Sequence, residues 1–229
     1  MLSAFARSKR IARYFPRLAR PSFTTSNLAG MDKKPSGSIL DWADKSGEFK
    51  RQQSVFRSWI ENKPNAEFPP EKGRYHLYVS YACPWAHRAL IVRELKGLKD
   101  IITYNSVHWH MGEKGWRFAT ADETISGETT PDPLHKEFTH LRDLYFEQNP
   151  EYEGRFTVPT LYDKKTNRIV SNESSEIIRM FYTAFDDIIE EQYKKVDLFP
   201  KALQKDIEAM NEWVYHDVNN GVYKSGFAT

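Results

Sequence analysis

The chain has 229 residues, of which 40% are hydrophobic and 28% are charged, the composition of an ordinary globular protein. Its net charge of +2 is unevenly spread, because residues 1–31 hold six of the 33 basic residues and no acidic residue. Without those six, 27 basic residues stand against 31 acidic ones, so the body of the chain, at −4, offers nucleic acid no electrostatic attraction.

The first 31 residues combine arginines and hydroxyl residues with interspersed apolar residues. Leu2, Phe5, Ile11 and Phe15 can share one face of a transient amphipathic helix, with the arginines on the other. This pattern is typical of a mitochondrial presequence, and we exclude the segment from the fold. A basic disordered tail on a cytoplasmic protein is the alternative.

The body of the chain begins with a polar extension and a strand–helix–strand unit. Residues 32–72 form the extension, in which apolar residues recur at helical spacing and predict one helix from about Gln52 to Glu61. A strand at Arg74–Ser80, a buried helix at 84–96 and a second strand at Ile101–Val107 follow. Their short connections imply parallel strand pairing with a right-handed crossover.

The later elements complete an α/β domain. In chain order they are a long polar loop, a helix, two antiparallel strands in a hairpin, and a second helix: 109–133, 134–148, Thr160–Asp163 with Arg168–Ser171, and 172–185. The order βαβ–α–ββ–α over residues 73–185 predicts a thioredoxin-like fold, a mixed sheet with helices on both faces. Residues 186–199 are predicted to be a charged linker, and a helix from about Pro200 to Asn219 starts an all-α domain at 200–229.

Cys83 is the only cysteine, so the chain has neither an internal disulfide framework nor a multi-cysteine metal site. It stands between a predicted strand and a helix whose first residue is Pro84, a position that proline favours. First-turn N–H groups and the helix dipole stabilise a thiolate there, and thiols so placed have pKa values of roughly 3.5–7.5 rather than about 8.5. We therefore predict a nucleophile rather than a small buried hydrophobe.

Ala86 stands three residues after Cys83, where dithiol oxidoreductases carry a second cysteine. An outside thiol must therefore resolve a mixed disulfide on Cys83, and glutathione is the abundant candidate. Val158-Pro159 precedes a predicted strand, and in thioredoxin-like proteins the bond before this proline is cis. The backbone of Val158 could then pair with an extended peptide, although an ordinary strand-opening proline is the alternative.

The segment 172–176, Asn-Glu-Ser-Ser-Glu, opens the next predicted helix, which several of its side chains could cap. It could also bind a ligand, because N–H groups and the Ser174 hydroxyl suit a carboxylate, while Glu173 suits an α-ammonium. One carboxylate and one ammonium together describe the γ-glutamyl end of glutathione.

Five motifs in order carry a family resemblance: Cys83-Pro84-Trp85-Ala86-His87-Arg88, Gly115-Trp116, Gly154-Arg155-Phe156-Thr157-Val158-Pro159, Asn172-Glu173-Ser174-Ser175-Glu176 and Asn219-Asn220-Gly221-Val222-Tyr223. With them the chain resembles, from about residue 40 to its last residue, the glutathionyl-hydroquinone reductases. These are Xi-class, omega-like glutathione transferases.

The resemblance implies a role for each site residue and no metal or nucleotide. Cys83 is expected to be the nucleophile that removes glutathione from a glutathionyl-hydroquinone, and Tyr223 to donate a proton or bind the quinol oxygen. Pro84 and Pro159 are structural. The residues expected to hold glutathione are Trp116, Arg155, Phe156, Thr157, Val158, Glu173 and Ser174.

Members of the family continue well past Tyr223, and their full-length form is expected to be a homodimer. The chain is therefore expected to be truncated in the helical C-terminal domain of a glutathione transferase, with the glutathione half of the site kept and most of the quinone half lost. An exposed apolar face on the 200–219 helix and poor solubility would follow.

Other functions fit parts of the sequence. A broader omega-like thioltransferase or a dehydroascorbate reductase shares the catalytic cysteine, and a non-catalytic glutathione-binding module needs no thiolate. His108 and His110 have no third ligand nearby, so zinc binding is not expected.

Overall fold

The computed structural model describes residues 53–227. The predicted presequence at 1–31 and the first half of the predicted extension at 32–72 lie outside the described residues, so the mitochondrial location stays a prediction.

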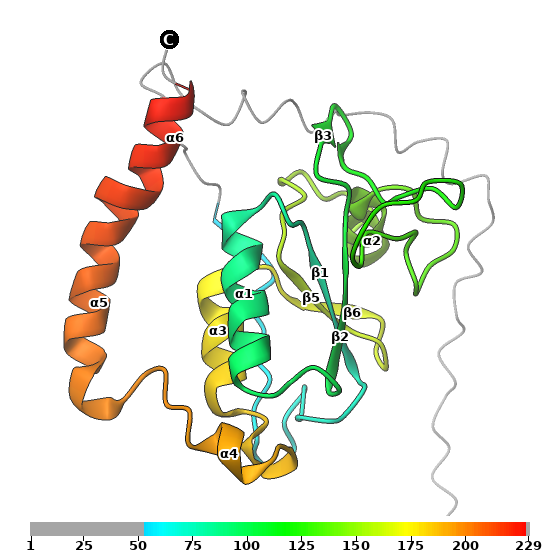
Figure 1. Ribbon diagram of the computed structural model, residues 1–229. Helices are drawn as coiled ribbons and strands as arrows, with labels where there is room; N and C mark the ends of the chain where they lie inside the picture. Colours follow the sequence, from blue (N-terminus) through cyan, green and yellow to red (C-terminus); the bar gives the residue numbers. More distant parts are fainter. Residues whose placement is uncertain (1–52, 228–229) are drawn as a thin grey trace, which may run out of the picture. The chain divides into compact units, whose positions relative to one another are not determined.

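A four-stranded mixed sheet forms the centre of the described chain, with the strand order β2-β1-β5-β6 (Figure 1). Its strands are β1 Tyr75–Val79, β2 Ile102–Ser106, β5 Thr160–Asp163 and β6 Arg168–Ser171. β1 pairs with β2 in parallel and with β5 antiparallel, and β5 and β6 form the predicted hairpin. This topology confirms the predicted thioredoxin-like α/β fold.

Three helices cover the two faces of this sheet (Figure 1). α1 Pro84–Leu95 and α3 Ser174–Thr183 pack side by side on one face, and α2 Leu141–Gln148 lies at the other. Because β1 and β6 run in the same direction, α1 and α3, which follow them, begin at the same edge of the sheet. The N-termini of these two helices therefore lie close together.

The helix predicted from about Gln52 to Glu61 is wrong for the part that the structure describes. From residue 54 onward exposed and more buried side chains alternate, with Val55 and Trp59 exposed and Ile60 buried, which is the pattern of an extended strand. This segment pairs along the outer edge of β6, where the N–H of Ser58 donates to the carbonyl oxygen of Val170 at 2.9 Å. Pairing at an open sheet edge overrides the local helical spacing.

The region between β2 and β5 also differs from the prediction. The long loop contains a small hairpin, β3 Met111–Gly112 with β4 Gly115–Trp116. The helix predicted over 134–148 begins only at Leu141, because the carboxylate of Asp143 accepts the N–H groups of Thr139 and His140 and caps the helix there.

The charged segment 186–199 contains a 3-10 turn at Asp186–Ile188 and the short helix α4 Glu191–Lys194. It is held against the end of α1, since the buried ammonium of Lys96 lies 3.1 Å from a carboxylate oxygen of Asp186 and 3.2 Å from the carbonyl oxygen of Val196. Gly97 has a positive φ of 65°, and a Cβ there would collide with the ring of Tyr193.

The last predicted helix is longer than the sequence indicated. A 3-10 turn at Lys201–Leu203 leads into α5 Gln204–Trp213, a π-helical segment at Val214–Asn219 and α6 Asn220–Phe227. Among the helices of residues 53–227, none is both long and apolar enough to span a bilayer.

Candidate active site

Cys83 lies at the edge of the sheet where β1 ends and α1 begins. Its backbone is extended, and its carbonyl oxygen accepts the N–H of Ala86 at 3.1 Å and that of His87 at 3.0 Å, which starts the helix. Pro84 occupies the first turn, as predicted. The half-buried sulfur of Cys83 therefore lies at the positive end of the α1 dipole, where a thiolate is stabilised.

The loop before β5 reaches this cysteine. The Val158-Pro159 bond is cis, as predicted, and the Cys83 thiol donates to the carbonyl oxygen of Val158 at 3.5 Å. The preceding carbonyl, that of Thr157, accepts the hydroxyls of Tyr145 at 2.9 Å and Thr160 at 2.7 Å. These hydrogen bonds fix the loop, so the backbone of Val158 is held beside the sulfur.

Phe156 and Arg155, two of the predicted glutathione ligands in this loop, differ in how much of the side chain a ligand could reach. The ring of Phe156 is buried against Tyr145 and Tyr152, so only its backbone can meet a ligand. Arg155 is half-buried, and burial lowers the pKa of its guanidinium. The hydroxyl of Tyr152 donates to the carbonyl oxygen of Arg155 at 3.0 Å and anchors the loop on its far side.

The start of α3 carries the two residues predicted to hold the γ-glutamyl group. Glu173 is the N-cap, and its carboxylate accepts the N–H of Ser175 at 3.1 Å. The hydroxyl of Ser174 accepts two N–H groups of Arg88, at 2.6 and 3.1 Å, and this guanidinium lies 3.9 Å from Glu173. Ser174 is only 4% exposed, and its hydroxyl can still donate its own proton while it accepts from Arg88.

Arg88 has no role in the sequence prediction, although it stands in the Cys83 motif. It projects from α1, and its Cζ lies 5.0 Å from the centroid of the Trp85 ring while its nitrogens reach Ser174 on α3. The signal in the sequence was the i, i+3 spacing of Trp85 and Arg88 on one helix. The contact with α3 required the tertiary structure.

Tyr223 on α6 is brought to the same end of α1. Its hydroxyl oxygen accepts the indole N–H of Trp85 at 3.0 Å, so the hydroxyl proton is not used in that bond. Tyr215 contributes a second ring near Trp85, with 6.3 Å between centroids. Trp116, in contrast, is only 6% exposed and is part of the hydrophobic core.

The described residues contain no group of three His, Cys, Asp or Glu side chains that could hold a metal ion. His108 and His110 are linked by a hydrogen bond in which Nδ1 of His108 accepts the N–H of His110 at 3.1 Å. The arrangement around Cys83 is thus a thiol, fixed backbone groups and a paired hydroxyl and carboxylate, suited to binding a thiol-containing peptide.

Comparison with known proteins shows which ones this chain resembles. Residues 82–184 match the family described as Glutathione S-transferase, N-terminal domain. The chain is 54% identical over 192 residues to glutathione S-transferase omega-like 2 of Schizosaccharomyces pombe, and 49% identical over 195 residues to the glutathionyl-hydroquinone reductase YqjG of Escherichia coli. These matches cover 83% and 82% of this chain but only 59% and 57% of those proteins, so the chain spans less than two thirds of their length.

The chain also resembles solved structures of glutathione transferases. The glutathione S-transferase Xi of Phanerochaete chrysosporium is 54% identical, with a TM-score of 0.75 over 82% of this chain and 58% of that one. The structure of YqjG, described as glutathione bound, is 49% identical, with a TM-score of 0.69 over 76% of this chain and 56% of that one.

Proposed function

We propose that the chain is a Xi-class, omega-like member of the glutathione transferase family and that it reduces glutathionyl-hydroquinones with glutathione as co-substrate. The observation that carries the proposal is the thiol of Cys83 at the N-terminus of α1, with the carbonyl of Val158 beside it. The E. coli relative is named for this reaction and its structure is described as glutathione bound, which supports the same substrate class here.

In the first step, the Cys83 thiolate attacks the sulfur of the glutathione conjugate. A sulfur–sulfur bond forms as the bond between that sulfur and the aromatic carbon breaks, and the carbon takes up a proton. The hydroquinone leaves reduced, and Cys83 becomes a mixed disulfide with glutathione. A second glutathione thiolate then attacks the glutathione sulfur of this disulfide, so that glutathione disulfide leaves and the Cys83 thiolate returns.

The neighbouring residues are assigned to binding and proton transfer. Ser174 and Glu173 would receive the γ-glutamyl carboxylate and ammonium, and the Val158 backbone would pair with the peptide. Tyr223 keeps its hydroxyl proton while accepting from Trp85, which suits a donor to the aromatic carbon or a partner of the quinol oxygen.

The test is the intact mass of the protein after exposure to a glutathione conjugate of 1,4-hydroquinone, with no other thiol present. We expect a gain of one glutathionyl group and the release of one equivalent of hydroquinone. Adding reduced glutathione should restore the original mass and yield glutathione disulfide. Because Cys83 is the only cysteine, the modified position is not ambiguous.

Cys83→Ser is the matched control, because serine is close to cysteine in size and is favoured at the N-cap position, but it lacks the thiolate nucleophile. The variant should fold with the same melting temperature and gain no mass. Hydroquinone release by the variant at the parent rate would rule out the mechanism. A parent protein that forms the mixed disulfide from glutathione disulfide but not from the conjugate would instead identify a general thioltransferase.

A further inference from the structure

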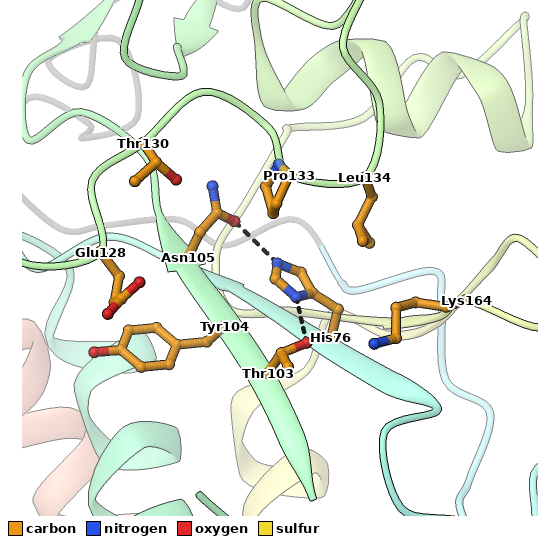
Figure 2. A pocket seen from close by; sticks show the side chains of 9 residues that line it. All are labelled: His76, Thr103, Tyr104, Asn105, Glu128, Thr130, Pro133, Leu134 and Lys164. Atoms are coloured by element: carbon orange, nitrogen blue, oxygen red, sulfur yellow. Dashed lines mark hydrogen bonds between the residues drawn. The ribbon is translucent and has the colours of Figure 1, made fainter. Parts of the chain in front are cut away.

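A pocket of about 250 Å³ lies at the β2 edge of the sheet, and Cys83 is not among the residues that line it (Figure 2). Tyr75 packs against Phe185 on the face covered by α1 and α3, so the next side chain along β1, that of His76, points to the opposite face. The residues that line the pocket are His76, Thr103, Tyr104, Asn105, Glu128, Thr130, Pro133, Leu134 and Lys164. None of them belongs to the glutathione site.

The floor of the pocket contains a polar group that lacks a partner. The Nε2 of His76 donates to Oδ1 of Asn105 at 3.1 Å, while Nδ1 lies 2.8 Å from the hydroxyl of Thr103. Asn105 is only 1% exposed. The nitrogen of its side-chain amide, Nδ2, is buried and has no hydrogen-bond partner among residues 53–227. An unpaired buried donor carries a desolvation cost, which an acceptor atom on a ligand or a water would recover.

Hydrogen bonds within the protein fix the loops that carry Glu128, Pro133 and Leu134, so the pocket does not need a ligand to form. Asp132, buried beneath the loop that carries Pro133 and Leu134, accepts the hydroxyl of Tyr78 at 3.1 Å and the N–H of Leu134 at 2.9 Å. On the other side, the N–H of Ser106 in β2 donates to the carbonyl oxygen of Glu128 at 2.8 Å. The pocket is therefore preformed, as binding sites usually are.

The charges that line the pocket are one of each sign and lie apart. Of the described lining residues, Lys164 is the only cation and Glu128 the only carboxylate, since burial lowers the pKa of His76 to about 4 and keeps it neutral. Figure 2 shows the ammonium of Lys164 on one side of the pocket, the carboxylate of Glu128 on the other, and Asn105 between them. A ligand that matches this order carries a carboxylate, a central acceptor and an ammonium.

We propose that this pocket binds a dipeptide-like zwitterion, with its carboxylate at Lys164, its amide carbonyl at Asn105 and its ammonium at Glu128. The size agrees, because 250 Å³ is the volume of roughly eight water molecules, close to the size of a dipeptide of small residues. Pro133 and Leu134 cover the short backbone between the charges.

The first experiment titrates the parent protein with glycylglycine and follows the side-chain NH₂ resonance of Asn105 by NMR. We expect a saturable shift with a dissociation constant of about a millimolar, the range for a ligand of so few atoms. Two probes of similar size test the recognition. 6-Aminohexanoate keeps both charges without the amide, N-acetylglycine keeps the amide and the carboxylate without the ammonium, and each should bind at least several-fold more weakly.

Variants locate the site without disturbing the fold. Lys164→Met removes a charge from a partly exposed position and Glu128→Gln from an exposed one, and each should weaken glycylglycine binding about tenfold. Lys165→Met is the control, because Lys165 is the adjacent residue but points to Glu71. Cys83→Ser should bind glycylglycine normally, which separates this pocket from the glutathione site.

Three results would overturn the proposal. One is the absence of a saturable shift, with only water contacting the Asn105 amide. Another is binding that survives Lys164→Met. The third is equal affinity for 6-aminohexanoate, which would remove the need for the amide carbonyl.

Discussion

The hydroxyl of Ser174 depends on Arg88 for its orientation. Both guanidinium hydrogen bonds to Ser174 come from a side chain that is also stacked on Trp85, so Arg88 connects the start of α3 with the helix that carries Cys83. The same guanidinium adds positive charge where the γ-glutamyl carboxylate is proposed to bind. If the proposed function holds, Arg88 would therefore position Ser174 for glutathione.

We predict that Arg88→Ala raises the KM for glutathione about tenfold, since one charge-assisted interaction of this kind is equivalent to about that factor. Arg88→Lys should not restore the parent value, because an ammonium cannot stack on Trp85 and donate two fixed N–H bonds to one hydroxyl. Steady-state kinetics with the hydroquinone conjugate would measure both variants.

Arg168→Ala is the matched control, because Arg168 also lies over an aromatic ring, that of Phe68, and pairs with Glu67, but it stands at the start of β6 rather than at the start of α3. It should leave the KM for glutathione unchanged. The rate at which iodoacetamide alkylates Cys83 should be similar in all variants. An unchanged KM in Arg88→Ala would show that Ser174 needs no such support.

Among the helices and strands, those that depend on local sequence patterns could be predicted from the sequence. The β1–α1–β2 unit and the β5–β6 hairpin follow from alternation, proline at a helix start and short connections, and their pairing is confirmed. The segment around Phe56 was misread as a helix because its partner, the edge of β6, lies more than a hundred residues further along the chain. The start of α2 was misplaced because one carboxylate, Asp143, caps it.

In the candidate site, too, the residues marked by local patterns could be predicted, and those that meet only in the folded chain could not. Cys83, Pro84 and the start of α3 could be named because each lies at a helix terminus, where the sequence shows both the cap and the chemistry. Arg88 and the Asn105 pocket could not, since both depend on side chains that meet across different elements. A buried donor without a partner is not visible in any local pattern.

The β1–β2 pair should make folding stability depend on pH through His76. Burial lowers the pKa of His76 to about 4, although the hydrogen bond with Asn105 opposes this, while an unfolded histidine has a pKa of about 6.5. Between these values the unfolded chain binds more protons, so stability is lost as the pH falls below 6.5. Urea unfolding at pH 7 and pH 5 should differ by about 2 kcal/mol from this residue alone.

His76→Gln removes the titrating group, and its loss of stability between pH 7 and pH 5 should be smaller than that of the parent by this amount. His135 is a comparison within the same protein, because its pKa shifts in the opposite direction to that of His76. Burial lowers its pKa, but the hydrogen bond and charge of Asp132 outweigh that effect and raise it. Its contribution is therefore present below 6.5 and lost as the pH rises through its folded pKa, the opposite window. Parallel pH curves for parent and His76→Gln would contradict the assignment.

At the scale of the whole described chain, the long helical segment from α5 to α6 presents two different sides. One side meets the thioredoxin-like domain through Tyr215, Tyr223 and the ion pair of Arg179 with Glu208. The other carries an apolar stripe of exposed side chains, which consists of Met210, Trp213, Val218 and Val222 together with Leu203 in the 3-10 turn before α5. The spacing of five between Trp213 and Val218 spans the π-helical segment, where five residues separate hydrogen-bonded positions, so the stripe stays on one side.

Exposed apolar patches promote self-association in general, so we expect this stripe to do so. We predict that Met210→Lys, which places a charge in its middle, shifts sedimentation profiles toward the monomer and lowers the binding of an apolar dye. Val55→Lys is the control, because Val55 is as exposed as Met210, at 56% against 57%, and gains the same charge, but does not belong to the stripe. Both variants should keep the parent melting temperature, since substitutions at exposed positions change stability by less than about 0.5 kcal/mol. Equal shifts in the two variants would mean that added charge, rather than the interrupted stripe, accounts for the change.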